Sequence, residues 1–155
     1  MTLASLLSPA QIVPELEATE HWPAIEELVD HLDRQKLLQG AERAAVLEAL
    51  REREEKTTTG VGYGVAIPHA FSDSTEKVIA AFGRSRAGIE FGALDNAPVR
   101  FIILFIVPRD EYHLHLKTLA AIAKMFNNAE IRQQLTEAPD ADAILRILSQ
   151  RPARV

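Results

Sequence analysis

Residues 99–107 read Val-Arg-Phe-Ile-Ile-Leu-Phe-Ile-Val, an apolar run with one charge near its start. The run is rich in β-branched and aromatic residues and does not alternate between apolar and polar positions, which predicts a strand buried on both faces. Such a strand needs helices above and below it. The run therefore predicts an α/β fold in which a mixed β-sheet is sandwiched between helices.

Segments in which apolar residues recur every three or four positions predict helices on both sides of this run in the sequence. The helices are expected at about residues 20–36, 41–54, 110–126, 129–137 and 141–148. Further strands are expected at 12–16, 65–67 and 78–82, and a bend at 88–92. In the helix over 110–126, the residues expected to face inward are Leu116, Leu119, Ala120 and Ala123. No repeat or low-complexity linker divides the chain, so residues 1–155 are expected to form a single domain.

Charge and composition limit the classes of function. The formal net charge of −5 argues against nucleic acid as a partner, because there is no basic surplus to neutralise phosphates. The absence of cysteine excludes disulfides and thiol chemistry. Residues 1–16 contain no lysine or arginine and no long apolar core, so they do not resemble a secretory signal. The longest uninterrupted apolar run, 101–107, is too short to span a bilayer, and we expect a cytoplasmic protein that is not embedded in a membrane.

Residues 57–70, Thr-Thr-Thr-Gly-Val-Gly-Tyr-Gly-Val-Ala-Ile-Pro-His-Ala, are the leading candidate for a functional site. The glycines permit close approach to the backbone, and Pro68 fixes the chain so that His69 is expected at the end of the strand over 65–67. The G-x-G-x-G spacing, followed by proline, argues against a dinucleotide site, and the absence of Gly-Lys-Ser/Thr argues against a Walker loop. From the residues alone, a flexible hairpin with an incidental histidine is an equal alternative.

Two neighbouring regions could complete a site. The charged segment 51–56 brings Arg53 within reach of anything bound at residues 57–70. Residues 109–115 lead from the strand over 99–107 into a helix N-terminus, where free amides favour an anion, and they contain His113 and His115. Helical periodicity does not choose between these two histidines. A metal site that uses both of them with His69 would need an extended His-x-His segment, and no metal is expected.

Several motifs in the chain, taken in order, resemble the enzyme IIA component of the bacterial sugar phosphotransferase system. The type of IIA component that they resemble is the fructose/mannitol class, which includes the nitrogen-regulatory IIA proteins. The motifs are Arg53-Glu54, Thr58-Thr59-Gly60, residues 62–69, Phe91, Asp95 and residues 115–120. The resemblance covers nearly the whole chain. Tyr63 departs from the family pattern, which more often has a small polar or acidic residue there, and we expect it to alter contacts around the phosphoryl group.

The resemblance implies phosphoryl transfer from a small histidine-phosphorylated carrier protein to His69, at Nε2. It implies that Arg53 and His115, rather than His113, stabilise the phosphoryl group, and that no cofactor takes part. The recipient would be a sugar-specific IIB component. The alternative is a nitrogen or metabolic regulatory module whose phosphorylation switches its affinity for a kinase or transporter without onward transfer.

The chemistry of these residue types agrees with that role. A neutral imidazole has a nitrogen lone pair available near neutral pH and is a good phosphoryl acceptor. The incoming group carries nearly two negative charges, which Arg53, the amides of the glycine stretch and His115 could compensate. Transfer between proteins needs an accessible histidine. We therefore expect His69 to lie in a shallow depression, with Phe71 in an apolar docking rim.

Overall fold

The computed structural model describes residues 3–38 and 41–150. Within these residues, the strand expected at 99–107 is β6 (Val99–Pro108), the central strand of a six-stranded mixed sheet. The other strands are β1 (Ile12–Val13), β2 (Gly60–Gly62), β3 (Val65–Ala66), β4 (His69–Ser72) and β5 (Ile79–Ile89). The strand order is β1-β5-β6-β3-β2, and β4 also pairs with β6. The expected α/β class is confirmed.

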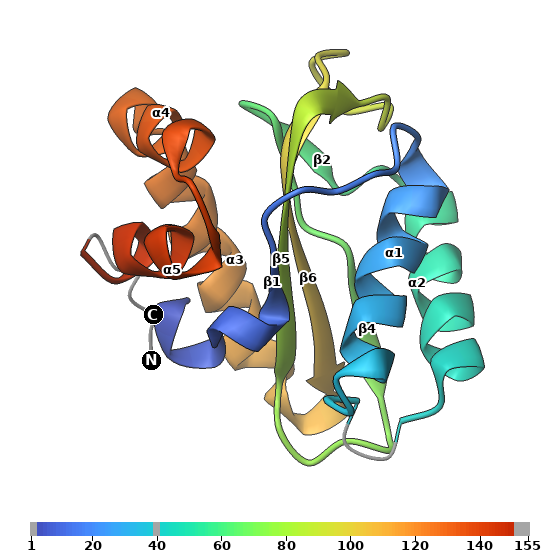
Figure 1. Ribbon diagram of the computed structural model, residues 1–155. Helices are drawn as coiled ribbons and strands as arrows, with labels where there is room; N and C mark the ends of the chain where they lie inside the picture. The colour runs from blue at the N-terminus through green and yellow to red at the C-terminus, as the bar shows by residue number, and fades with distance from the viewer. Residues whose placement is uncertain (1–2, 39–40, 151–155) are drawn as a thin grey trace.

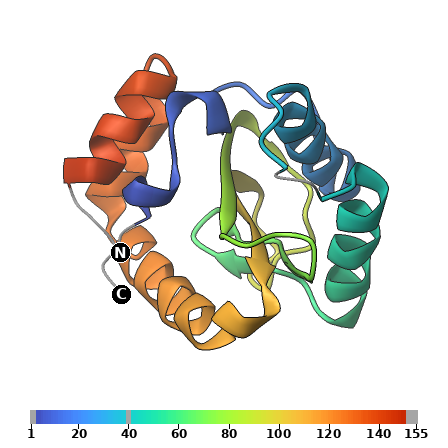
Figure 2. The same cartoon turned by 90° about the horizontal axis from the view of Figure 1, so that it is seen from below.

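Both faces of β6 are covered by helices (Figures 1 and 2). On one face lie α1 (His21–Arg34) and α2 (Arg43–Lys56), and on the other lie α3 (Tyr112–Phe126), α4 (Ala129–Glu137) and α5 (Ala141–Gln150). Alternate β6 side chains join different core clusters. Phe101, Ile103, Phe105 and Val107 pack with the α3–α5 layer, and Ile102, Leu104 and Ile106 pack with the α1–α2 layer. This two-sided burial explains why the run has no polar alternation.

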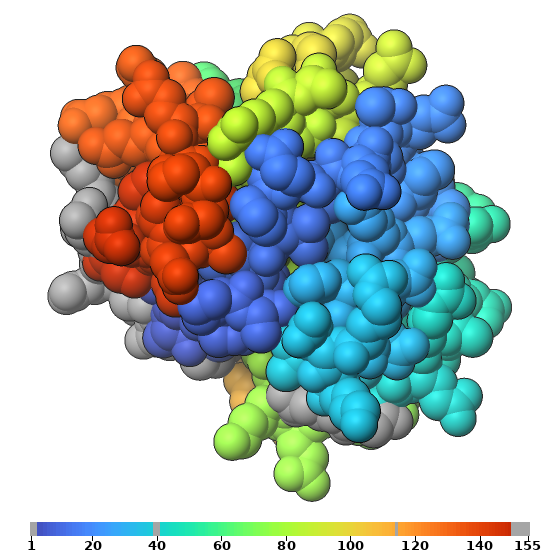
Figure 3. Space-filling model, viewed as in Figure 1, coloured from blue at the N-terminus to red at the C-terminus, as the bar shows by residue number. Residues whose placement is uncertain are grey.

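The N-terminal segment closes one side of the sheet. It contains the 3₁₀ turns Ala4–Leu6 and Pro9–Gln11 and then β1, which pairs parallel with β5 at the sheet edge. Figure 3 shows this segment, in blue, at the surface between the C-terminal helices and α1. The expected strand at 12–16 is confirmed as an edge strand, although it stops before Pro14, whose nitrogen has no hydrogen to donate to the sheet.

The strand expected at 78–82 is longer than predicted. It continues as β5 to Ile89 and pairs antiparallel with β6 from Ile79 to Arg84 and again at Ile89, with a register shift between Arg84 and Ile89. Arg84 is 1% exposed, and its guanidinium donates to the carbonyl oxygens of Pro14 (3.0 Å), Leu135 (2.8 Å) and Ala138 (2.5 Å). A charged residue is thus accommodated inside a strand, because the residue that follows β1 and the end of α4 supply it with acceptors.

The inward face predicted for α3 is partly wrong. Leu116 is 45% exposed and Ala120 and Ala123 are also exposed, whereas His115 and Thr118 are buried on the same face as Ile122. Apolar periodicity misplaced this face because two of its buried positions are polar. None of the helices in the described ranges is long and apolar enough to cross a bilayer.

Candidate functional site

His69 lies at the point where β3 ends and β4 begins, two short strands that pair with successive parts of β6. β3 ends at Ala66 and β4 begins at His69, and both pair parallel with β6, with Val65 opposite Phe101 and His69 opposite Phe105. Between them, the carbonyl oxygen of Pro68 accepts from Phe105 N at 3.0 Å. Proline cannot donate a ladder hydrogen bond, so it divides the edge into two short strands. The side chain of His69 is half-buried, at the start of the second strand.

The backbone fixes the orientation of the His69 ring. Nδ1 lies 2.9 Å from the carbonyl oxygen of Ile67, and because a carbonyl oxygen only accepts, Nδ1 carries the ring proton and donates it. Nε2 therefore has the lone pair. Arg53 Nε donates to this atom at 3.2 Å. The arrangement leaves a neutral imidazole whose basic nitrogen faces a guanidinium.

Arg53 is itself held by the end of its own helix. It lies in the last turn of α2, and its Nη1 donates to the carbonyl oxygen of Thr57, the C-cap residue, at 2.9 Å. A cation near a helix C-terminus is favoured by the helix dipole and by free carbonyl groups. The guanidinium is therefore positioned by α2 before any anion arrives.

His115 approaches His69 from α3. The two rings lie 4.8 Å apart between centroids, and His115 also packs edge-on against Phe105 and Phe71 at 5.6 and 5.9 Å. His115 is 4% exposed, and its Nε2 is buried without a hydrogen-bond partner among the described residues. A buried ring nitrogen without a partner costs free energy unless something else satisfies it.

Both histidines favour the neutral form. Burial, and to a smaller extent the neighbouring His69, lower the pKa of His115 to about 4. The pKa of His69 is lowered mainly by burial and also by Arg53, while the hydrogen bond to Ile67 and the Glu54 carboxylate oppose the shift. Near neutral pH both rings are therefore uncharged, and the His69 lone pair is available.

The structure separates the two histidines that the sequence could not rank. His113 is exposed and His115 is buried beside His69, because both lie in α3 two positions apart. The extended His-x-His segment considered for a metal site is therefore wrong. Within residues 3–38 and 41–150, no cluster of three or more His, Cys, Asp or Glu has the arrangement to hold a metal ion.

The glycine stretch lies further from His69 than expected. Gly62 and Gly64 have positive φ angles of 103° and 75° at the β2–β3 hairpin, and the carbonyl oxygen of Gly64 accepts from Arg100 N and Phe101 N. Phe101 is four residues before Phe105, the partner of His69, which corresponds to about 13 Å along β6. Gly62 and Gly64 are therefore too far along the sheet to supply amides to a group on His69, and the expectation is wrong for these two glycines.

Tyr63 belongs to the same hairpin. Its φ is 57°, its side chain is 58% exposed, and the guanidinium of Arg132 lies 4.8 Å from its ring centre. The expectation that Tyr63 alters contacts around a phosphoryl group is wrong for the same geometric reason. Its contact is instead with α4.

No role was predicted for Glu54, although it directly follows Arg53 in the chain. The Glu54 side chain is 4% exposed and bonds to Thr59 and to His21 Nε2, the latter at 3.0 Å. Its place in the Arg53-Glu54 motif was a signal, but the burial of its carboxylate and the polar partners that burial requires are not visible in the sequence. Those partners come from α1 and from the segment after α2, which local sequence patterns do not connect.

Apolar side chains of β4 and α3 lie near the histidine pair. Phe71, half-buried on β4, lies 6.4 Å from the His69 ring and 5.6 Å from the ring of Tyr112, which is 47% exposed. Leu116, next to His115, is also exposed. We call Phe71, Tyr112 and Leu116 the apolar rim.

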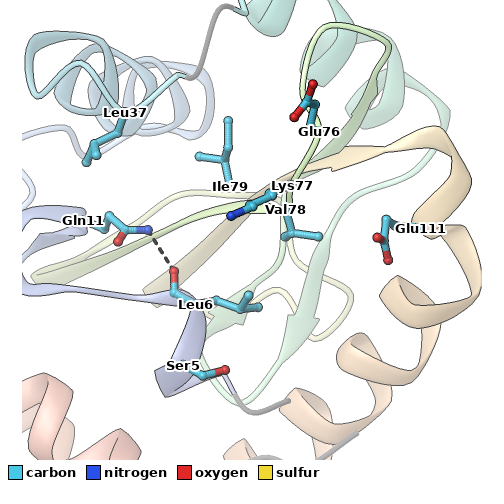
Figure 4. Close-up of a pocket in the computed structure, with 9 residues that line it drawn as sticks. All are labelled: Ser5, Leu6, Gln11, Leu37, Glu76, Lys77, Val78, Ile79 and Glu111. Atoms are coloured by element: carbon cyan, nitrogen blue, oxygen red, sulfur yellow. Dashed lines mark hydrogen bonds between the residues drawn. The ribbon is translucent and has the colours of Figure 1, made fainter.

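A pocket of about 370 Å³ lies elsewhere, between the N-terminal segment and the start of β5. Gln11, Lys77 and Glu111 contribute polar groups to its lining, and Gln11 Nε2 donates to the carbonyl oxygen of Leu6 (Figure 4). None of its lining residues is His69, Arg53 or His115. It is separate from the site described above.

Comparison with known proteins identifies the family. The model of the family described as "Phosphoenolpyruvate-dependent sugar phosphotransferase system, EIIA 2" matches residues 5–151. The chain belongs to the EIIA 2 family. This confirms the resemblance found from the motifs.

Relatives of this EIIA 2 chain have two kinds of name. A nitrogen regulatory protein of Bradyrhizobium diazoefficiens is 36% identical over 99% of this chain and 98% of its own length. The fructose-specific EIIABC component of Bacillus subtilis is 35% identical over 97% of this chain, which corresponds to 23% of that protein. The crystal structure of the nitrogen regulatory protein IIA-Ntr from Neisseria meningitidis is 32% identical and superposes with a TM-score of 0.86, covering 94% of this chain and 98% of that chain.

Proposed function

We propose that this protein is a histidine phosphocarrier in which His69 Nε2 accepts a phosphoryl group from a histidine-phosphorylated carrier protein, and that residues 1–155 form one domain of this type. The observation that carries the proposal is the pair of contacts on one ring. Nδ1 donates to Ile67 O, and Nε2 faces Arg53 Nε at 3.2 Å. Family membership supports phosphotransferase chemistry, and the ring geometry supports this atom as the acceptor.

The transfer step needs no cofactor. The lone pair of His69 Nε2 attacks the phosphorus atom, the phosphorus–nitrogen bond of the donor breaks, and the donor imidazole leaves with that electron pair. The modified His69 ring keeps its Nδ1 proton and gains positive charge, which the Ile67 carbonyl oxygen stabilises. In onward transfer His69 becomes the donor: a recipient imidazole or thiolate attacks the phosphorus atom, and the phosphorus–nitrogen bond to His69 Nε2 breaks.

Two groups in the site compensate the charge of the bound phosphoryl group. Arg53 supplies a fixed cation with several donors, as guanidinium groups do for phosphate. His115 supplies a buried ring nitrogen that has no hydrogen-bond partner in the part of the chain that the structure describes, and a phosphoryl oxygen would satisfy it. A nearby dianion would also raise the pKa of His115 from its value of about 4, which strengthens this contact.

The apolar rim is the proposed contact surface for partner proteins. Phe71, Tyr112 and Leu116 adjoin the histidine pair and are at least partly exposed, as expected for a surface that docks transiently. The proposed recipient is a sugar-specific IIB component, and the proposed location is the cytoplasm. The relative named EIIABC supports a link to sugar transport.

The proposal is tested by incubating the protein with phosphoenolpyruvate, the two general phosphotransferase proteins and no other component. We expect an acid-labile mass increase of one phosphate in the wild type and none in His69→Ala. An unmodified wild type, or a His69→Ala variant modified to the same extent, would contradict the proposal.

A regulatory role without onward transfer is the second candidate. The nitrogen regulatory protein of Bradyrhizobium diazoefficiens, which matches this chain over nearly the full length of both, favours it. In that role phosphorylation of His69 changes affinity for a kinase or transporter. A pull-down with phosphorylated and unphosphorylated protein distinguishes the two, since equal recovery of every partner would argue against a switch.

A further inference from the structure

A buried carboxylate lies behind the proposed phosphoryl site. The Glu54 side chain accepts from Thr59 twice, from the hydroxyl and from the backbone N–H at 3.3 Å, and it bonds to His21 Nε2 at 3.0 Å. Thr59 is 2% exposed. A buried charged group that is this fully partnered fixes the relative positions of the segments that supply its partners.

Thr59 connects this carboxylate to the His69 ring. The Thr59 carbonyl oxygen accepts from Ile67 N at 2.9 Å, and the Ile67 carbonyl oxygen accepts from His69 Nδ1 at 2.9 Å. The path from Glu54 to His69 therefore consists of hydrogen bonds through two residues. Moving Thr59 would move the carbonyl group that orients the ring and selects its tautomer.

His21 holds the carboxylate from the opposite side. It is the first residue of α1, and its ring packs against Phe91 with a centroid distance of 4.1 Å. Phe91 is 3% exposed, so this contact is anchored in the core. Glu54 is thus held between α1 and the segment that precedes β2, while Arg53, the adjacent residue, reaches His69 directly.

We propose that Glu54 is a positioning residue for phosphoryl transfer, acting through Thr59 and Ile67 on the orientation and tautomer of His69, with His21 holding the carboxylate in place. This inference rests on the proposed function of His69. It assigns to the Arg53-Glu54 pair two separate tasks, since Arg53 compensates charge at Nε2 and Glu54 acts on the ring through Nδ1.

The first test needs no phosphoryl donor. Nitrogen-15 chemical shifts of the His69 ring should show one tautomer, protonated at Nδ1, in the wild type. In Glu54→Ala we expect a mixture of tautomers, and in Glu54→Gln, which keeps hydrogen bonds to Thr59 but removes the charge, a spectrum close to that of the wild type. Glu55→Ala, an exposed neighbour with the same change in charge, is the matched control. An unchanged tautomer in Glu54→Ala would overturn the inference.

The second test measures the rate of phosphoryl transfer. We expect Glu54→Ala to be slower by about tenfold or more, Glu54→Gln to recover most of the rate, and Glu55→Ala to match the wild type. If Glu54→Ala does not fold, Thr59→Val decides, because it keeps the buried shape and removes the hydroxyl. A Thr59→Val variant with the wild-type tautomer and rate would overturn the inference. A wild type that accepts no phosphoryl group would instead contradict the proposed function, and the tautomer measurement would still test Glu54.

Discussion

Arg53 Nε lies 3.2 Å from His69 Nε2, on the side of the ring opposite the Nδ1 proton that Ile67 holds. A permanent cation therefore faces the only basic nitrogen of this imidazole. Burial lowers the pKa of His69 and the Arg53 guanidinium lowers it further, so the ring favours the neutral form. The contact also places a guanidinium where a group bound to Nε2 would lie.

Replacing Arg53 should impair transfer more than it impairs folding. We expect Arg53→Ala to reduce the rate of phosphoryl acceptance by about 100-fold, because a preorganised donor at a developing charge is lost. The rate of Arg53→Lys should lie between those of the wild type and Arg53→Ala. Lysine keeps the charge but lacks the second donor group with which the guanidinium also reaches Thr57. Arg51→Ala is the control, because it removes an arginine of the same helix whose guanidinium lies over the Trp22 ring and not at His69. Single-turnover kinetics measures all three, and equal rates would contradict the role of Arg53.

His113 and His115 form a matched pair for testing the second histidine. His115→Gln should slow phosphoryl acceptance by about tenfold, because the buried partner of the phosphoryl oxygens is changed. His113→Gln should stay within about twofold of the wild type, since that side chain is exposed. The comparison uses the same donor and the same assay. A larger loss of the acceptance rate in His113→Gln than in His115→Gln would contradict the assignment of His115 as the second histidine of the site.

The low pKa of His115 predicts a stability difference with pH. The unfolded chain binds a proton at this residue below about pH 6.5, whereas the folded chain does so only near pH 4. Stability is therefore fully present above pH 6.5 and falls as the pH drops toward 4. Relative to His115→Gln, the wild type should lose about 1.5 kcal/mol between pH 6.5 and pH 5. Urea unfolding at several pH values measures it, and parallel pH profiles would show that His115 is not held neutral.

The apolar rim should determine affinity for the donor carrier protein rather than chemistry. Leu116→Asp is expected to weaken donor binding by about tenfold while the maximal transfer rate changes little. Tyr63→Asp is the matched control, because Tyr63 is exposed at the distant hairpin and aspartate tolerates its positive φ. Steady-state kinetics with varied donor separates the two effects. Equal weakening by both variants would argue against the rim as the docking surface.

The fold was predictable wherever a single pattern decided it. The run at 99–107 identified the central strand because both of its faces are apolar. The end of β5 was missed because Arg84 is buried with acceptors from Pro14 and from the end of α4, which lie far away in the sequence. The inward face of α3 was missed because His115 and Thr118 occupy buried positions.

The site was predictable only in part, for a similar reason. The motif order pointed to His69, Arg53 and His115, and the structure brings these three side chains together. Residue types alone could not choose His115 over His113, since both flank the apolar face that periodicity predicts for the helix over 110–126. Glu54 and His21 were missed because their contact joins two helices, and only tertiary packing connects them.

The central claim is that a phosphoryl group binds to Nε2 of His69. Phosphorus-31 and nitrogen-15 NMR of the phosphorylated protein, with nitrogen-15 in the histidine rings, measures this directly. We predict a phosphorus–nitrogen coupling to Nε2 of His69 and an Nδ1 that keeps its proton. Coupling to Nδ1, or to a ring nitrogen of any other histidine, would contradict the account.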